Sequence, residues 1–173
     1  ADCAAGVYIM LRMLEAQVPG LYVFHRDEEV GGGGSQYFAQ NLHKLGEFDR
    51  CIAFDRAGYY DVITHQGGLA TASLGFAQAL SAALDTCYKP CNTGVFTDSM
   101  NYAEVVPECT NISVGYENQH SKHEKQCLVH LGWLAQRCLE IPWEELPVHR
   151  EASELVYDLY PRDAYIEDYD MQQ

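Results

Sequence analysis

Residues 21–32 read Leu21-Tyr22-Val23-Phe24-His25-Arg26-Asp27-Glu28-Glu29-Val30-Gly31-Gly32, an apolar run followed by an acidic turn and glycines. The apolar composition predicts a short buried strand over residues 21–25. Gly31–Gly34 resembles a flexible linker in composition, but it lies between this strand and a helix predicted over residues 35–42, with Ser35 as its N-cap. A close-packed turn is therefore the favoured interpretation, and it places the acidic pair just beyond a strand.

The rest of the chain alternates between short apolar runs and longer helical patterns. Val7, Met10, Leu11 and Leu14 recur at helical spacing until Pro19-Gly20 ends the pattern. Helices are predicted over residues 4–17, 35–42, 70–87 and 125–139, and strands over residues 21–25, 51–54, 60–64, 94–97 and 111–115. This alternation predicts an α/β fold, a three-layer αβα sandwich with a mostly parallel, mixed central sheet.

Charged side chains follow the predicted strands. In open α/β sheets, functional groups gather just beyond the carboxyl ends of the strands. The residues at these positions are Asp27, Glu28 and Glu29 after the first strand, Asp55 and Arg56 after the second, Asp98 after the fourth, and His120 downstream of the fifth. Asp2 joins them if a strand precedes the first helix. We therefore expect acids and a histidine to meet at one edge of the sheet.

Carboxylate oxygens together with imidazole nitrogen are ligands that suit zinc. Asp2, Glu29, Asp55 and His120 can supply such a shell. A cation would also relieve the repulsion between neighbouring carboxylates. A further acid beside the metal can serve as a general base. Adjacent residues in a turn can divide these tasks, which would make Glu28 the base and Glu29 a ligand.

The composition indicates one compact domain over residues 1–173, with 47% hydrophobic residues. No stretch approaches the roughly 18–20 uninterrupted apolar residues of a membrane span, and no signal peptide or membrane partner is indicated. The formal charge of −14, with only 11 Lys and Arg, argues against binding to nucleic acid. Much of the acidic excess falls in residues 140–173, which are expected to form a solvated segment packed on the domain or extending from it.

The seven cysteines are an odd number, and several lie in apolar runs where a free thiol packs as a small hydrophobic group. A reducing compartment, and hence a cytoplasmic location, fits this pattern best. Cys87-Tyr88-Lys89-Pro90-Cys91 could form a metal or redox pair. Its three intervening residues and the lack of a second cysteine pair make that signal weak.

Five segments between residues 2 and 121 follow one another in the order of a known family. They are Ala1-Asp2-Cys3-Ala4-Ala5-Gly6-Val7, Asp27-Glu28-Glu29-Val30-Gly31-Gly32 with Ser35, Phe54-Asp55, Thr97-Asp98-Ser99, and Ser113-Val114-Gly115-Tyr116 leading to His120-Ser121. In content and order these segments resemble the co-catalytic zinc exopeptidases, a family that includes bacterial aminopeptidases and glutamate carboxypeptidase-like enzymes. The first segment is similar to that family's Gly-Ala-Asp-Asp opening of a helix.

The resemblance implies a zinc-dependent exopeptidase, with an aminopeptidase favoured, that acts on a peptide or amide. The implied ligands of two zinc ions are Asp2 as the bridge, Glu29 with His120 for one ion, and Asp55 for the other. Glu28 is implied to be the general base that takes the proton of the zinc-bound water. Asp98 and Arg56 are expected to contact the substrate, and assembly into a homo-oligomer is an open expectation.

Members of that family have one further ligand, a histidine in a His-x-Asp motif on a strand before the segment of Asp2. The chain is therefore expected to be truncated at its N-terminus, with the zinc site of Asp2 and Asp55 incomplete. Two alternatives stay open: a peptidase-fold domain that binds without catalysing, and a carboxypeptidase or deacylase of the same clan. His123 is the fallback ligand for His120.

Each of these residues also has a purely structural interpretation. Glu28 and Glu29 could form a solvated turn, and His120 could be a surface histidine. Asp55 could cap a turn at Gly58, and Asp98 could be the N-cap of the segment that begins at Ser99. The structural context of these residues separates the two kinds of interpretation.

Overall fold

The computed structural model describes residues 4–152. Its main sheet has four strands in the order β1-β6-β2-β5, namely β1 (Arg50–Arg56), β6 (Glu108–Ser113), β2 (Asp61–Ile63) and β5 (Lys89–Cys91). β1 and β6 are parallel and so are β2 and β5, whereas β2 and β6 are antiparallel. The sheet is therefore mixed and mostly parallel, as the sequence predicts.

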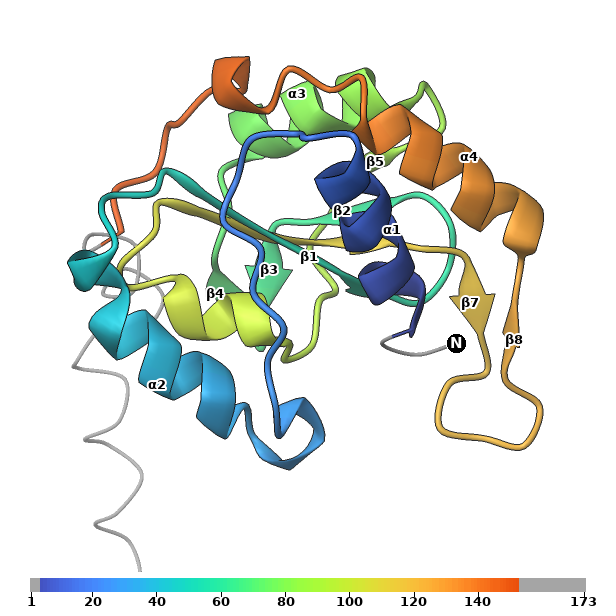
Figure 1. Cartoon of the computed structure of the whole chain (residues 1–173), viewed down its shortest axis with the longest axis horizontal. Coiled ribbons are helices and arrows are strands. Elements are labelled where there is room, and N and C mark those ends of the chain that lie inside the picture. Colours follow the sequence, from blue (N-terminus) through green and yellow to red (C-terminus); the bar gives the residue numbers. More distant parts are fainter. Residues whose placement is uncertain (1–3, 153–173) are drawn as a thin grey trace, which may run out of the picture.

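Helices cover both faces of this sheet (Figure 1). α1 (Ala4–Glu15), α3 (Leu74–Leu84) and α4 (Leu128–Cys138) lie on one face, and α2 (Gly33–Asn41) lies with the 3-10 helix η3 (Asp98–Tyr102) on the other. The predicted three-layer α/β architecture is thus confirmed. The shorter elements are η1 (Glu28–Val30), η2 (Leu42–Lys44), β3 (His65–Gln66), β4 (Leu69–Ala70), β7 (Tyr116–Glu117), β8 (Lys125–Gln126) and η4 (Trp143–Glu145).

Two hydrophobic clusters hold the layers together, one on each face of the sheet. Because successive side chains of a strand point to opposite faces, β1 contributes to both. Phe54 packs in the cluster under α1, α3 and α4, and Cys51 packs against the cluster beneath α2. β6 does the same with Ile112 and Cys109. All residues of β6 are buried, as expected for a strand between two neighbours in a covered sheet.

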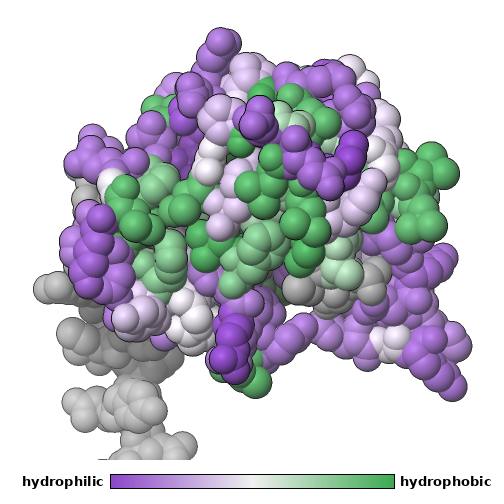
Figure 2. All heavy atoms as spheres, in the orientation of Figure 1, coloured by the Kyte–Doolittle hydropathy of each residue, from purple (hydrophilic) through white to green (hydrophobic). Residues whose placement is uncertain are grey.

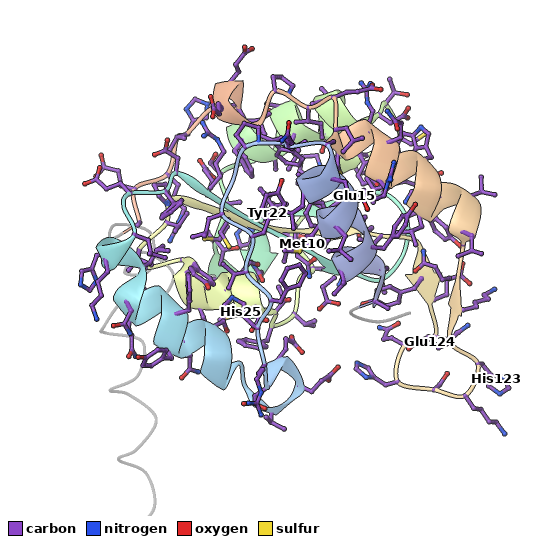
Figure 3. All side chains as sticks on the ribbon, viewed as in Figure 1. Met10, Glu15, Tyr22, His25, His123 and Glu124 are labelled. Atoms are coloured by element: carbon purple, nitrogen blue, oxygen red, sulfur yellow. The ribbon has the colours of Figure 1, made fainter. Side chains whose placement is uncertain are left out.

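The prediction of a buried strand over residues 21–25 is wrong. This segment forms no strand with any part of the chain between residues 4 and 152, and Leu21 and Phe24 keep 46% and 49% of their surface exposed. It crosses beside α1 as an extended connection to η1 (Figure 1), and Figure 2 shows apolar side chains gathered over this region. Tyr22 turns inward beside Met10 (Figure 3), and its hydroxyl donates to the carbonyl of Val18 at 2.9 Å. Apolar composition predicted burial here, but strand formation needs a backbone partner.

The strand predicted over residues 94–97 is also wrong, because only Gly94 makes a single bridge, to Gln66. Its place in the sheet is taken by β5, which contains Pro90. A proline cannot donate to a strand ladder, so it is tolerated on an edge strand, and β5 is the edge of the sheet.

Three predicted helices begin at other residues than expected. α3 starts at Leu74 rather than at residue 70, since the Ser73 hydroxyl accepts from the amide of Phe76 at 3.1 Å. α4 starts at Leu128 because residues 125–126 pair in β8. The N-cap of α2 is Gly32, with φ of 69°, and not Ser35.

The acidic C-terminal stretch predicted over residues 140–173 is only partly described. Its described part does not form a purely solvated face, because Ile141, Leu146 and Arg150 are buried. Residues 153–173 lie outside the described residues, as does Asp2. Within residues 4–152, no helix is both long enough and apolar enough to cross a membrane.

Candidate active site

Glu28 and Glu29 lie in η1, a single 3-10 turn at the end of the extended segment. The turn is closed by three backbone hydrogen bonds: Val30 and Gly32 donate to the carbonyl of Asp27 at 3.3 and 2.8 Å, and Gly31 donates to the carbonyl of Glu28 at 3.1 Å. Asp27 has φ of 66°, a left-handed conformation that Asp tolerates better than most residues. The predicted close-packed turn is confirmed, and it holds Glu28 half-buried and Glu29 exposed.

Polar side chains from α2 and η3 hold this turn in place. Ser35 is fully buried, and its hydroxyl lies 2.5 Å from Asp98 Oδ1 and 2.9 Å from the carbonyl oxygen of Gly32. Asn101 Nδ2 donates to Ser35 Oγ at 2.7 Å and to the Gly32 carbonyl at 3.3 Å. We call Ser35, Asp98 and Asn101 the turn clamp. It connects the end of the acidic turn to α2 and η3.

Gly32 and Gly31 offer a matched test of this clamp. Both have positive φ, 69° and 102°, so alanine at either costs about 1–2 kcal/mol of backbone strain. A Cβ at Gly32 would also approach Asn101 Nδ2 to 2.6 Å and Phe96 Cζ to 2.7 Å, whereas one at Gly31 meets nothing within 4 Å. We expect Gly32→Ala to lower the free energy of unfolding by about 1–3 kcal/mol more than Gly31→Ala, measured by urea unfolding. Equal losses would contradict close packing at Gly32.

His25 lies under the same turn, in contact with Phe38 and Tyr102 rather than with the acidic pair (Figure 3). Its Nε2 is 2.7 Å from the hydroxyl of Tyr102. Burial lowers the pKa of His25, and the nearby Asp98 carboxylate opposes that shift. His25 is therefore a packed histidine whose burial favours the neutral ring.

Asp55 is held at the carboxyl end of β1 by three groups. Its amide donates to Asn111 Oδ1 at 2.9 Å, and its carbonyl accepts from the hydroxyl of Tyr116 at 2.8 Å. Thr97 Oγ1 donates to its carboxylate at 3.4 Å. Because β1 and β6 are parallel, Asn111 on β6 reaches Asp55 at the shared edge of the sheet.

His120 lies in the exposed loop between β7 and β8, with φ of 57°. Its Nδ1 is 3.8 Å from Glu29 Oε1, although the two residues are far apart in the sequence. The fallback residue His123 lies at the outer end of this loop (Figure 3) and does not line the cavity described below. The fold thus brings His120 rather than His123 to the acidic turn.

A cavity of about 460 Å³ opens at this edge of the sheet. It is lined by Glu28, Glu29, Gly31, Asp55, Arg56, Ala57, Ile63, Gly94, Val95, Phe96, Asn111, Tyr116, Gln119 and His120. Five of the seven predicted site residues therefore share one cavity. Asp98 does not line it and instead belongs to the turn clamp, and Asp2 lies outside the described residues.

The carboxylates and the imidazole that line the cavity are types of ligand that zinc accepts. Glu29 and His120 offer one oxygen and one nitrogen at 3.8 Å, close to the separation of two ligands on one ion. Among residues 4–152, no three His, Cys, Asp or Glu side chains gather into a complete metal site. Glu29 and His120 therefore lie near each other without forming a complete metal site among the described residues, and Asp55 lies in the same cavity.

Asn111, Tyr116 and Thr97 were missed in the sequence, although all three hold Asp55 in place. A signal existed for Asn111, because it is a polar residue inside an otherwise buried strand, and such a group needs a partner. For Tyr116 and Thr97 the partner is set by tertiary contacts, which no local pattern reveals.

Comparison with solved structures identifies the fold of the chain. The solved structures that are similar to this chain include PhTET1-12s, a dodecamer in the asymmetric unit, which matches 80% of the chain with a TM-score of 0.63 and 18% identity. They also include aminopeptidase APDkam598 from the archaeon Desulfurococcus kamchatkensis, which matches 80% of the chain with a TM-score of 0.58 and 23% identity. The chain has an aminopeptidase-like fold. No protein-family model and no curated protein matches the sequence.

The match covers 47% and 46% of the lengths of these two proteins, so the chain spans about half of each. At 18% and 23% identity the likeness concerns the backbone arrangement alone. It agrees with the family resemblance of the sequence motifs and with the α/β architecture. The chemistry of the cavity must be argued from its own residues.

Proposed function

We propose that this domain belongs to a zinc-dependent exopeptidase that hydrolyses a peptide or amide, with an aminopeptidase favoured. The observation that carries the proposal is the single cavity that gathers Glu28, Glu29, Asp55 and His120 at the carboxyl edge of the sheet. These residues come from three separate segments, namely η1, the end of β1 and the loop between β7 and β8, and they face one space only because of the fold. A solvated acidic turn would need no such convergence.

In this proposal each residue has one task. Glu29 and His120 would hold one zinc ion, and Asp55 would contribute to a second, with Asp2 as the bridge. Bound zinc polarises the peptide carbonyl and makes water more acidic. Glu28 takes a proton from the attacking water and hands it to the nitrogen of the leaving amine. Asn111, Thr97 and Tyr116 keep Asp55 at the cavity wall.

His120 provides the direct test of the metal site. We expect His120→Ala to weaken zinc binding by about 100-fold or more, because losing a ligand exceeds the 10- to 100-fold cost typical of outer-shell partners. Zinc affinity is measured by isothermal titration calorimetry, alongside hydrolysis of aminoacyl p-nitroanilides. The control is His43→Ala, an exposed histidine that does not line the cavity. Equal zinc affinity in both variants would overturn the assignment.

Zinc binding, together with assays on peptides blocked at one end or the other, separates the alternatives. Zinc binding without hydrolysis of any peptide would favour a non-catalytic binding module, a reading that draws on the lack of a complete metal cluster among residues 4–152. If peptides blocked at the N-terminus are hydrolysed and peptides blocked at the C-terminus are not, a carboxypeptidase or deacylase is favoured. The reverse preference supports the aminopeptidase.

Self-association and a cytoplasmic location are also part of the proposal. Self-association draws on the apolar side chains exposed on one face (Figure 2). Leu11 and Leu14 of α1 are also exposed. A neighbour in fold, PhTET1-12s, is a dodecamer in its crystal's asymmetric unit. The cytoplasmic location draws on cysteines alone, six of which are free thiols within the described residues.

A further inference from the structure

Arg56 is the one Arg or Lys side chain among the residues that line the cavity. It is the last residue of β1, directly after Asp55, and its side chain keeps 22% of its surface exposed. The other charged groups on the wall are the carboxylates of Glu28, Glu29 and Asp55. A single guanidinium within an acidic site marks a position where negative charge on a ligand would be accepted.

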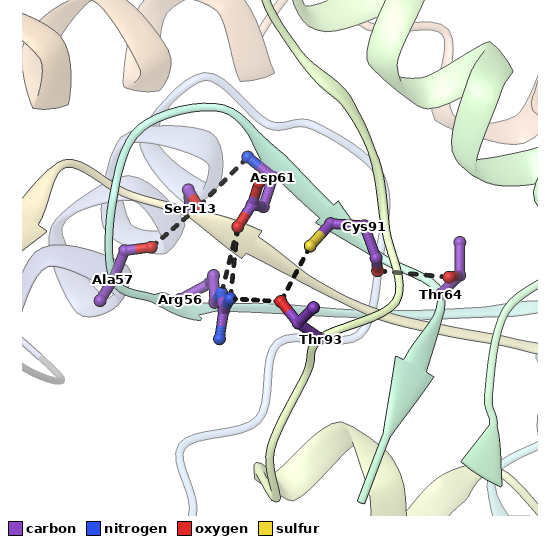
Figure 4. A network of polar contacts seen from close by, with 7 residues as sticks. All are labelled: Arg56, Ala57, Asp61, Thr64, Cys91, Thr93 and Ser113. Carbon is purple, nitrogen blue, oxygen red and sulfur yellow. Dashed lines mark hydrogen bonds and ion pairs between the residues drawn. The ribbon is translucent and has the colours of Figure 1, made fainter. Parts of the chain in front are cut away.

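The guanidinium of Arg56 is held in a fixed orientation (Figure 4). Its Nε and Nη2 donate to Asp61 Oδ2 at 3.4 and 3.3 Å, and Nη2 also donates to Thr93 Oγ1 at 3.1 Å. Thr93 Oγ1 is in turn 3.1 Å from the sulfur of Cys91. These contacts use one side of the planar group.

The other terminal nitrogen, Nη1, makes no hydrogen bond to any residue between 4 and 152. A guanidinium that is anchored on one side presents its remaining N–H groups at little conformational cost. Charge-assisted hydrogen bonds from arginine are strong and match the geometry of a carboxylate. Apolar side chains of Ile63, Val95 and Phe96 line the same cavity and can pack against the aliphatic part of a ligand.

We propose that Arg56 selects substrates that carry a carboxylate, which binds at Nη1. This inference rests on the proposed function, because it names the substrate class of the same cavity. The carboxylate has two sources in a peptide: the side chain of an N-terminal Asp or Glu, or the terminal carboxylate of a short peptide. Both present the same group to Arg56, and the test separates them.

The test compares paired substrates that differ only in this charge. Glutamyl and glutaminyl dipeptide amides test the side chain, and a leucyl dipeptide with a free or amidated C-terminus tests the terminal carboxylate. In the wild-type chain we expect the charged member of one pair to have the lower KM. In Arg56→Gln that KM rises about 10- to 100-fold, while the KM of its neutral partner changes little. Equal KM values within both pairs would overturn the inference.

Asp61→Asn is the control for a structural role of Arg56. It removes the ion pair that anchors the guanidinium but keeps the guanidinium itself. If Arg56 served only to hold the turn between β1 and β2, Asp61→Asn would raise all KM values as Arg56→Gln does. We expect it instead to keep the preference for the charged substrate. Arg12→Gln, at an exposed arginine on α1, reports the effect of removing surface charge.

A binding measurement keeps the inference separate from the proposed function. Glutarate is titrated into the zinc-free 173-residue chain and into Arg56→Gln, with binding followed by NMR chemical shifts. Loss of glutarate binding in the variant supports the carboxylate site even if no peptide is hydrolysed, in which case only the proposed function fails. Hydrolysis of peptides with no difference in glutarate binding would overturn the inference and leave the proposed function standing.

Discussion

Glu28→Gln lowers peptide turnover by about 100- to 10,000-fold, the usual contribution of a general base, while bound zinc stays unchanged. Glutamine has nearly the same shape as glutamate but cannot accept a proton from water at neutral pH. Glu28 is half-buried in η1 and faces the cavity, whereas Glu29 next to it reaches toward His120. The two variants at this turn should therefore differ: kcat falls in Glu28→Gln, and zinc affinity falls in Glu29→Gln.

Turnover is measured as kcat on the preferred aminoacyl substrate, with zinc content determined by mass spectrometry of the same samples. Glu47→Gln serves as the control, because Glu47 is exposed, lies outside the cavity and undergoes the same chemical change. Loss of zinc in Glu28→Gln would instead make Glu28 a ligand. Unchanged turnover with zinc retained would remove Glu28 from the mechanism.

A strand can be predicted from composition where helices cover its apolar side chains on both faces of the sheet. β1 contains the apolar run 51–54 between two helical layers, so composition alone indicates it. β6 is largely polar in sequence, and only its residues 111–113 fall within the strand predicted over residues 111–115. Residues 21–25 are similar in composition to the run in β1, yet they find no strand partner among the described residues and remain half-exposed. Local pattern reports the tendency to be buried, whereas pairing depends on the rest of the molecule.

The site shows the same division. The order of the motifs and the rule on carboxyl ends were enough to predict that Glu28, Glu29, Asp55, Arg56 and His120 would meet, and the cavity contains all five. The task of Asp98 was beyond that reasoning. Its partner Ser35 is distant in sequence and looked like a helix cap, but the hydroxyl points into the turn clamp instead. Contacts between side chains of distant segments are what sequence periodicity does not encode.

Glu108→Ala lowers the free energy of unfolding by about 3–5 kcal/mol, the range for removing one partner from a buried charged network. Glu108 is fully buried at the start of β6. Its carboxylate accepts four hydrogen bonds: from the amide and hydroxyl of Ser73 at 2.6 and 2.8 Å, and from the amides of His149 and Arg150 at 2.8 and 3.1 Å. Alanine would leave all four buried or half-buried donors without this acceptor.

The loss extends beyond these four bonds because Glu108 joins three parts of the fold. Ser73 is the N-cap of α3, so its position sets the start of that helix. Arg150 is buried too, and its guanidinium donates to the carbonyls of Ala103, Val106 and Pro107. Burial lowers the pKa of Arg150, and the neighbouring Cys109 and Glu108 oppose that shift.

Thermal and urea unfolding measure the effect, with a midpoint shift of roughly 10 °C expected for a chain of this size. Glu104→Ala is the matched control, since Glu104 is an exposed glutamate in the same segment before β6. Glu108→Gln tests the charge separately: it keeps one acceptor oxygen but turns an NH₂ group toward the donors, so a loss intermediate between the two alanine variants is expected. A loss below about 1 kcal/mol in Glu108→Ala would mean that residues 147–150 are held to the sheet without this carboxylate.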